Sequence, residues 1–153
     1  MDYQAILDTV PTIIYVKDDK DPLAPVFYNK AWYEYTGVLP EDVKYGWEKV
    51  VHPQDIPRLR KEIRANVEKG NPYEIEVRIL NKDTGRYRWF VARACPLVDE
   101  TGKELWVGTL IDVHEAKMLL ENTTAQYESE IETRTKRIKA LEEELKIHQT
   151  GTQ

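Results

Sequence analysis

Apolar and polar residues alternate strictly in "YEIEVRIL", residues 73–80, and this two-residue period predicts a β-strand. Two more strand-like runs follow at 86–98 and 104–113, after the turn sequences "NKDTG" and "DETG". Short apolar runs at 12–16 and 26–28 predict two further strands near the N-terminus. We therefore expect a five-stranded antiparallel sheet whose last three strands form a meander.

A helical period of three to four residues stands between the second and third predicted strands. The apolar residues that carry it are Ile56, Leu59, Ile63 and Val67. Gly70 supplies the end signal for this helix, and a shorter helix is expected between Asn29 and Gly37. Further short helices are expected from Pro40 and, as a lead-in, over residues 3–9. Together these elements predict an α+β fold with short helices on one face of the sheet.

The sequence changes character at Glu115, after which no glycine or proline occurs before Gly151. This predicts one continuous helix over residues 115–148, about 50 Å long at about 1.5 Å per residue. A heptad pattern places six apolar residues on one seam: Leu120, Tyr127, Ile131, Ile138, Leu141 and Leu145. Polar residues interrupt the seam at Thr124, Arg134 and His148.

We expect this helix to form a parallel coiled coil between two chains. Its apolar stripe is too narrow for burial in the core of a monomer. The alternative is a solvated helix that packs against its own domain. Residues 149–153 are expected to be a disordered tail.

Composition and charge narrow the possible functions. A chain of 153 residues with 41% hydrophobic and 32% charged residues fits one globular domain, residues 1–114, plus the charged helix. The net charge of −5 provides no basic field for nucleic acid or an anionic membrane. Because no apolar run is long enough to span a bilayer and no signal peptide is recognisable, we expect a cytoplasmic protein without direct membrane insertion.

Candidate chemistry is sparse. The three histidines, His52, His114 and His148, have no metal-ligand spacing, so no metal is expected. The single cysteine, Cys95, precedes Pro96 on a predicted strand and is interpreted as a small buried hydrophobic residue. No glycine-rich phosphate loop and no nucleophile–base arrangement is present, so we do not expect an enzyme.

Four ordered motifs resemble those of one family. They are Asn-x-Ala at Asn29, His-Pro-x-Asp at His52, Gly-x-Tyr-Arg-Trp at Gly85 and Gly-x-x-x-Asp-Val at Gly108. From about Leu7 to Lys117 the chain resembles a PAS domain of the bacterial sensory-box subclass with its PAC segment. The tail is similar to the signalling helices that follow PAS domains in sensor histidine kinases and diguanylate cyclases.

The resemblance implies the PAS fold and a non-enzymatic sensory and dimerisation module. Such a module senses a small ligand or a partner and transmits the signal through its C-terminal helix to an output domain, here by preference a histidine kinase. It implies a homodimer formed through that helix and the PAS surface. A stand-alone interaction adaptor without a ligand, or the PAS module of a diguanylate cyclase or chemoreceptor, remain alternatives.

The resemblance also implies two sites. A ligand pocket under the helices would include Trp32, Ile63, Glu76, Arg78, Phe90, Ala92, Ala94 and Leu110. A signal joint would consist of Asp112, Val113, His114, Glu115 and Arg88. The pocket assignment conflicts with the alternation of residues 73–80, which sends Ile75, Val77 and Ile79 inward instead, so the inward face of this strand stays open.

At the joint, the Asp112 carboxylate is expected to accept a charge-assisted hydrogen bond from Arg88 or Arg93, and Glu115 favours the start of the following helix. His114 replaces the family's usual Thr or Ser, which makes the joint either looser or sensitive to pH.

Flavin and haem are both disfavoured as cofactors. The reactive cysteine of light-sensing relatives, in an Asn-Cys-Arg-Phe motif, has no counterpart between Asn29 and Gly70, and the helix 56–70 lacks the histidine typical of haem-binding relatives. No cofactor is predicted, and an unidentified small ligand remains possible.

Overall fold

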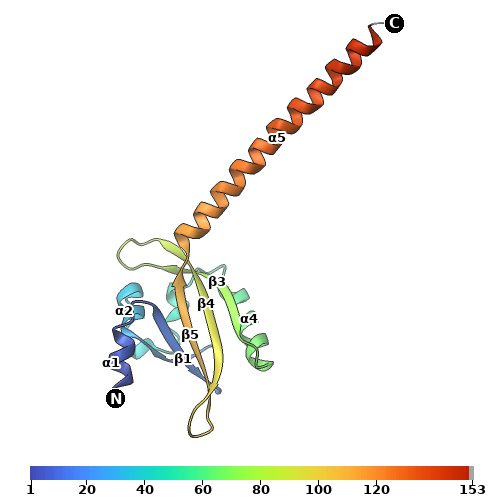
Figure 1. Cartoon of the computed structure of the whole chain (residues 1–153). Coiled ribbons are helices and arrows are strands. Elements are labelled where there is room, and N and C mark those ends of the chain that lie inside the picture. The colour runs from blue at the N-terminus through green and yellow to red at the C-terminus, as the bar shows by residue number, and fades with distance from the viewer. Residues whose placement is uncertain (152–153) are drawn as a thin grey trace. The chain divides into compact units, whose positions relative to one another are not determined.

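The computed structural model describes residues 1–151 of the chain (Figure 1). These residues form two units, one ending at His114 and the other beginning at Glu115.

The first unit is built on a five-stranded sheet with the order β2-β1-β5-β4-β3, in which every neighbouring pair is antiparallel. The strands are β1 (Ile13–Asp18), β2 (Pro25–Tyr28), β3 (Tyr73–Leu80), β4 (Tyr87–Val98) and β5 (Glu104–Asp112). The predicted sheet and its closing meander are thus confirmed. β1 continues two residues beyond its predicted end and pairs along its whole length with β5.

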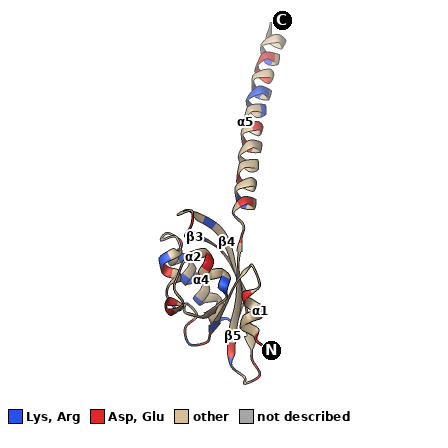
Figure 2. Ribbon diagram, turned by 90° about the vertical axis from the view of Figure 1, so that its left-hand side faces the viewer, with Lys and Arg blue, Asp and Glu red and all other residues tan. Residues whose placement is uncertain are grey.

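Short helices connect the strands. They are α1 (Tyr3–Asp8), α2 (Lys30–Thr36), the 3-10 helix η1 (Pro40–Asp42), α3 (Trp47–Val50) and α4 (Ile56–Glu68). α2 and α4 lie on the same side of the sheet (Figure 2). α2 ends where predicted, because Gly37 adopts a left-handed conformation with φ of 71° and donates its N–H to the Tyr33 carbonyl.

Asn29 stands at the N-cap of α2, as predicted, but its side chain does not cap the helix. Its Oδ1 accepts the N–H of Ile14 at 2.9 Å, and its Nδ2 donates to the carbonyls of Leu7 and Thr12, each at 2.9 Å. The side chain is completely buried. Asn29 therefore ties the segment after α1 to the first strand.

The core lies between the sheet and the covering helices. Alternate residues of β3, namely Ile75, Val77 and Ile79, are at most 3% exposed and pack in one cluster with Trp32 of α2 and Ile63 of α4. The alternation of this strand, rather than the family pattern, therefore identifies its inward face.

The second unit consists of the helix α5 (His114–Thr150), which has no buried residue. It is two residues longer than predicted, because the sequence offers no break before Gly151, whose N–H donates to the Ile147 carbonyl at 3.0 Å. The prediction of disorder is therefore wrong for residues 149 and 150, and for 152–153 it lies outside the described residues. Ion pairs at i,i+4, such as Lys136 with Glu132 at 2.9 Å, line this helix. Within residues 1–151, no helix combines the length and apolarity that crossing a bilayer requires.

Candidate functional site

A cavity of about 50 Å³ lies between the sheet and the helices. Its lining residues are Tyr15, Lys17, Leu23, Pro25, Tyr28, Trp32, Trp47, Val51, Leu59, Ile63, Val77, Ile79, Ala92 and Leu110. Four residues of the predicted pocket are brought together in this lining: Trp32, Ile63, Ala92 and Leu110. Phe90 and Ala94 are buried in the same core without lining the cavity.

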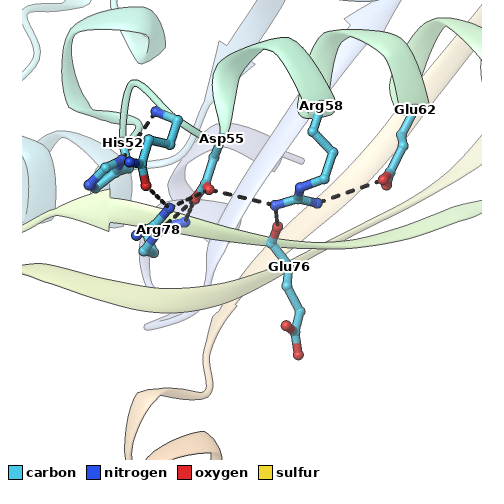
Figure 3. A network of polar contacts seen from close by, with 7 residues as sticks. His52, Asp55, Arg58, Glu62, Glu76 and Arg78 are labelled. Carbon is cyan, nitrogen blue, oxygen red and sulfur yellow. Dashed lines mark hydrogen bonds and ion pairs between the residues drawn. The ribbon is translucent and has the colours of Figure 1, made fainter.

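The placement of Glu76 and Arg78 in the pocket is wrong. Successive side chains of a strand point to opposite faces, and the inward positions beside them belong to Val77 and Ile79. The Glu76 side chain is exposed. The Arg78 side chain instead reaches Asp55, the residue that precedes α4 (Figure 3).

Asp55 is the centre of a polar network that joins α4 to β3 (Figure 3). Only 4% exposed, it accepts hydrogen bonds from Arg78 through the backbone N–H at 2.9 Å, Nε at 3.1 Å and Nη2 at 2.7 Å. Burial alone would raise the pKa of Asp55, but these hydrogen bonds and the charges of Arg78 and Arg58 outweigh burial and lower it. Arg58 also donates to the Glu76 carbonyl at 2.6 Å.

His52 belongs to the structural surroundings of this network. Its backbone N–H donates to the Arg78 carbonyl at 2.9 Å, and its Nδ1 accepts the N–H of Gln54 at 3.2 Å. The His-Pro-x-Asp motif therefore fastens the start of α4 to the edge strand.

Lys17 is a cavity residue that the sequence reasoning missed. It is 5% exposed, and its Nζ donates to the Tyr73 hydroxyl at 3.0 Å, which lies 3.1 Å from the Tyr15 hydroxyl. Nζ also lies 5.2 Å and 5.5 Å from the centroids of these two rings. Burial lowers the pKa of Lys17 to about 7, against the opposing charge of Asp21. The alternation of β1 was the available signal, since it places Lys17 on the face of Ile13 and Tyr15.

Aromatic rings fill most of the space around the cavity. Tyr28 stacks on Trp32 with centroids 4.2 Å apart, and the Trp47 Nε1 donates to the Leu23 carbonyl at 2.8 Å. Ligand pockets for molecules of drug size have roughly 300 Å³ or more. The remaining 50 Å³ therefore does not fit a flavin.

Gly108 of β5 makes room for one of these rings. A Cβ atom at this position would lie 2.3 Å from Cζ of Tyr15, far inside van der Waals contact. The absent side chain therefore lets the Tyr15 ring cross the sheet and place its hydroxyl beside Tyr73.

The residues of the predicted joint that lie in the first unit are in mutual contact. Arg88 Nε donates to Asp112 Oδ2 at 2.7 Å, and Asp112 Oδ1 accepts the backbone N–H of His114 at 3.0 Å. Burial would raise the pKa of Asp112, but the hydrogen bonds from Arg88 and His114 and their charges outweigh it, so the pKa is lowered. Of the two arginines considered, Arg88 is the partner, because Arg93 pairs with Glu74 at 3.7 Å.

His114 and Val113 fasten the end of β5 to β4. The Val113 N–H donates to the Trp89 carbonyl at 2.9 Å, and His114 Nδ1 accepts the Trp89 N–H at 3.2 Å. The imidazole therefore supplies a cross-strand contact at the position where a hydroxyl was expected. Glu115 lies in the first turn of α5.

The six predicted seam residues of α5 are all exposed in the single chain. They are Leu120, Tyr127, Ile131, Ile138, Leu141 and Leu145. Two other exposed apolar residues of α5, Leu119 and Ile147, fall off this seam at heptad position c.

The interpretation of Cys95 as buried is wrong. The thiol is exposed, because the inward positions of this part of β4 are taken by Ala92 and Ala94. Among the described residues, no group of three or more His, Cys, Asp or Glu side chains is arranged to hold a metal ion.

Comparison with known proteins identifies the fold and the family. The family model described as "PAS fold" matches residues 25–110, more than half of the chain. The chain belongs to the PAS family. This confirms the resemblance seen in the sequence motifs, and the match lies within the unit that contains both the cavity and the Arg88–Asp112 pair.

Two relatives place this PAS domain in larger proteins. It is 28% identical over 115 residues to the peroxide stress-activated histidine kinase mak3 of Schizosaccharomyces pombe, which covers 75% of this chain and 5% of the kinase. It is 31% identical over 103 residues to the uncharacterized protein y4lL of Sinorhizobium fredii, covering 66% of this chain and 12% of that protein. The chain thus spans only a small part of these relatives.

Solved structures share the PAS fold. A sensory box histidine kinase/response regulator from Burkholderia thailandensis has a TM-score of 0.60 and 20% identity, over 84% of this chain and 97% of that one. The N-terminal domain of a diguanylate cyclase from Marinobacter aquaeolei has a TM-score of 0.58 and 20% identity, over 69% and 98%. An RNA-binding light-oxygen-voltage receptor has a TM-score of 0.64 and 22% identity, over 80% and 36%.

Proposed function

We propose that this PAS domain senses a small ligand or partner and transmits the signal, as a dimer, through α5 to an output domain. The observation that carries the proposal is the bonded end of β5. Arg88 and Asp112 form a two-point ion pair, and the next two residues each bond to Trp89 of β4. Because α5 begins immediately afterwards in the chain, a displacement of β5 by a ligand reaches the first residues of the helix.

Ligand binding changes such an equilibrium only if the ligand binds the two states unequally. Leu110 and Ala92 line the cavity, and they are paired neighbours on β5 and β4, with Asp112 two residues beyond Leu110. A group bound in the cavity therefore acts on the same strand that carries the ion pair.

Dimerisation of α5 supports this mechanism. Its apolar seam recurs with heptad spacing over a 37-residue helix, and a helix of this charge without burial of its seam would leave large apolar side chains in water. Burial of those side chains between two chains stabilises a dimer at about 25 cal/mol for each Å² removed from water.

A histidine kinase is the output domain that the comparisons favour, because the mak3 relative carries that name. The structural likeness to a diguanylate cyclase domain supports the runner-up, a cyclase parent. The chemoreceptor and adaptor readings rest on the sequence alone, and the adaptor differs in having no small ligand.

The proposal is tested by a matched pair of substitutions on α5. Ile138→Asp places a charge on the seam, whereas Ile147→Asp makes the same change at an exposed position off the seam. Sedimentation velocity is expected to show a dimer for the unchanged chain and for Ile147→Asp. The dimer of Ile138→Asp should dissociate at least about 100-fold more readily, because a carboxylate on each chain loses water in the interface. Equal dissociation of both variants would refute the seam.

A further inference from the structure

The cavity carries a buried positive charge without a matching negative one. Lys17 Nζ has three donors and uses one of them on the Tyr73 hydroxyl. Within residues 1–151, no ion pair to Lys17 is found, and Asp21 acts on it only as a more distant charge. A buried ammonium is costly unless it is paired, so this arrangement is suited to an anionic partner.

A second donor at the cavity is independent of Lys17. Trp32 lines the cavity and is 1% exposed, and its indole N–H has no hydrogen-bond acceptor among the described residues. Buried N–H groups are nearly always hydrogen-bonded in folded proteins. Both unsatisfied groups are donors, and both therefore require an acceptor.

The rest of the wall is mainly apolar and the space is small. Leu59, Ile63 and Leu110 contribute hydrocarbon surface. A cavity needs roughly 10–15 Å³ to hold one water molecule, so 50 Å³ takes a group of only a few heavy atoms. An occupant must then combine one negative charge, hydrogen-bond acceptors and a short apolar end.

We propose that the cavity binds a short-chain monocarboxylate of the size of acetate or propionate, with its carboxylate on Lys17 and its hydrocarbon end against the apolar wall. This inference rests on the proposed function and names the ligand class of the same cavity. The bound carboxylate supplies the counter-charge that Lys17 lacks and accepts from donors at the cavity wall.

The charge of Lys17 makes binding depend on pH. The titratable groups that face it are the hydroxyls of Tyr15 and Tyr73, and the pKa of each is raised by burial, so both are neutral below pH 9. Asp21 is the nearby acid and is ionised throughout this range. Since burial lowers the pKa of Lys17 to about 7, the carboxylate is expected to bind on the order of 50-fold more weakly at pH 9 than at pH 6.5.

The test uses the full chain, with sodium acetate as the probe at constant ionic strength and pH 6.5. The four tryptophan indole N–H resonances are followed by ¹H–¹⁵N NMR. One indole resonance is expected to shift and saturate, with a Kd of about 0.1–10 mM for a ligand of four heavy atoms. Lys17→Met, of similar length without the charge, should weaken binding at least tenfold, and Tyr73→Phe several-fold. Lys20→Met, at an exposed lysine three residues away, should not change it.

Three results would overturn the inference. They are no saturable shift up to 100 mM acetate, equal affinity of the Lys17→Met chain when its circular dichroism shows it folded, or tighter binding of succinate, whose second charge meets an apolar wall. Sedimentation of the same samples separates this failure from that of the proposed function. Loss of carboxylate binding with an intact dimer rejects the ligand class alone, whereas a monomer that binds acetate rejects the coiled coil alone.

Discussion

Replacement of Lys17 by Met should make the PAS domain more stable at neutral pH. Lys17 is 5% exposed and has a tyrosine hydroxyl, not a carboxylate, as its hydrogen-bond partner. Methionine keeps an unbranched chain of similar length and removes the charge. The substitution loses one hydrogen bond, worth about 1 kcal/mol, and removes the larger free-energy cost of burying an ammonium group.

The size of this cost follows from the pKa of Lys17. Burial lowers the pKa from its ordinary value of 10.5 to about 7, so between these pH values the unfolded chain holds a proton that the folded chain has released. Stability therefore rises with pH in this window, and the cost of the charge is fully present below pH 7. Integrated from pH 7 to pH 9, the free energy of unfolding rises by about 2 kcal/mol, and the whole cost at pH 7 is about 4 kcal/mol.

Urea unfolding followed by tryptophan fluorescence at pH 7, 8 and 9, in buffers free of carboxylates, measures this effect. The pH range stays below 10, where tyrosines of the unfolded chain begin to ionise and where the raised pKa values of Tyr15, Tyr28 and Tyr73 would lower stability. Lys17→Met should be more stable at pH 7 and should lack the rise, while Lys20→Met should retain it. Parallel pH profiles for the unchanged chain and Lys17→Met would refute the reasoning.

Three further substitutions have definite expected outcomes. Asp112→Asn should lower the free energy of unfolding by at most about 1 kcal/mol, because its ion pair with Arg88 is partly exposed, but should measurably speed hydrogen exchange at the end of β5 in NMR spectra. Gly108→Ala should cost about 1–3 kcal/mol in urea unfolding, because the new methyl group meets the Tyr15 ring. Asp55→Asn should cost about 2–4 kcal/mol at pH 7, and the difference should shrink as the pH falls below about 4, because the lowered pKa of Asp55 makes its contribution present above the unfolded pKa and lost in acid. An unchanged acid limb in the Asp55→Asn chain would contradict the assigned pKa direction.

The sheet and the long helices were predictable because each depends on local pattern. The alternation of Ile75, Val77 and Ile79 identifies both the strand and its inward face, and it proved more reliable than the family pattern that placed Glu76 and Arg78 in the pocket. Hydrophobic alternation succeeded here because burying either charged side chain would have cost several kcal/mol, whereas the opposite face leaves Arg78 free to reach Asp55.

The chemistry of the cavity was less predictable, because it depends on residues distant in the chain. Lys17 and Tyr73 are 56 residues apart and meet only when the sheet brings β1 and β3 under the same helices. Cys95 was misplaced for a related reason: its apolar neighbours suggested burial, while the register of β4 assigns the inward positions to Ala92 and Ala94. The end of the helix at Gly151 instead of 148 shows that a helix without a break continues until one occurs.

The central claim, a signal carried by a parallel pair of α5 helices, is tested most directly by distances between two spin labels across the dimer. Labels at Ser129 and, separately, at Glu143, in a Cys95→Ser background, lie on the outer side of the predicted seam. With helix axes about 10 Å apart, a parallel coiled coil predicts similar distances of about 20–35 Å at both positions. Distances that differ between the positions by about 40 Å would indicate antiparallel helices, since 14 residues advance about 21 Å on each helix. That result, or the absence of any coupling between chains, would contradict the account.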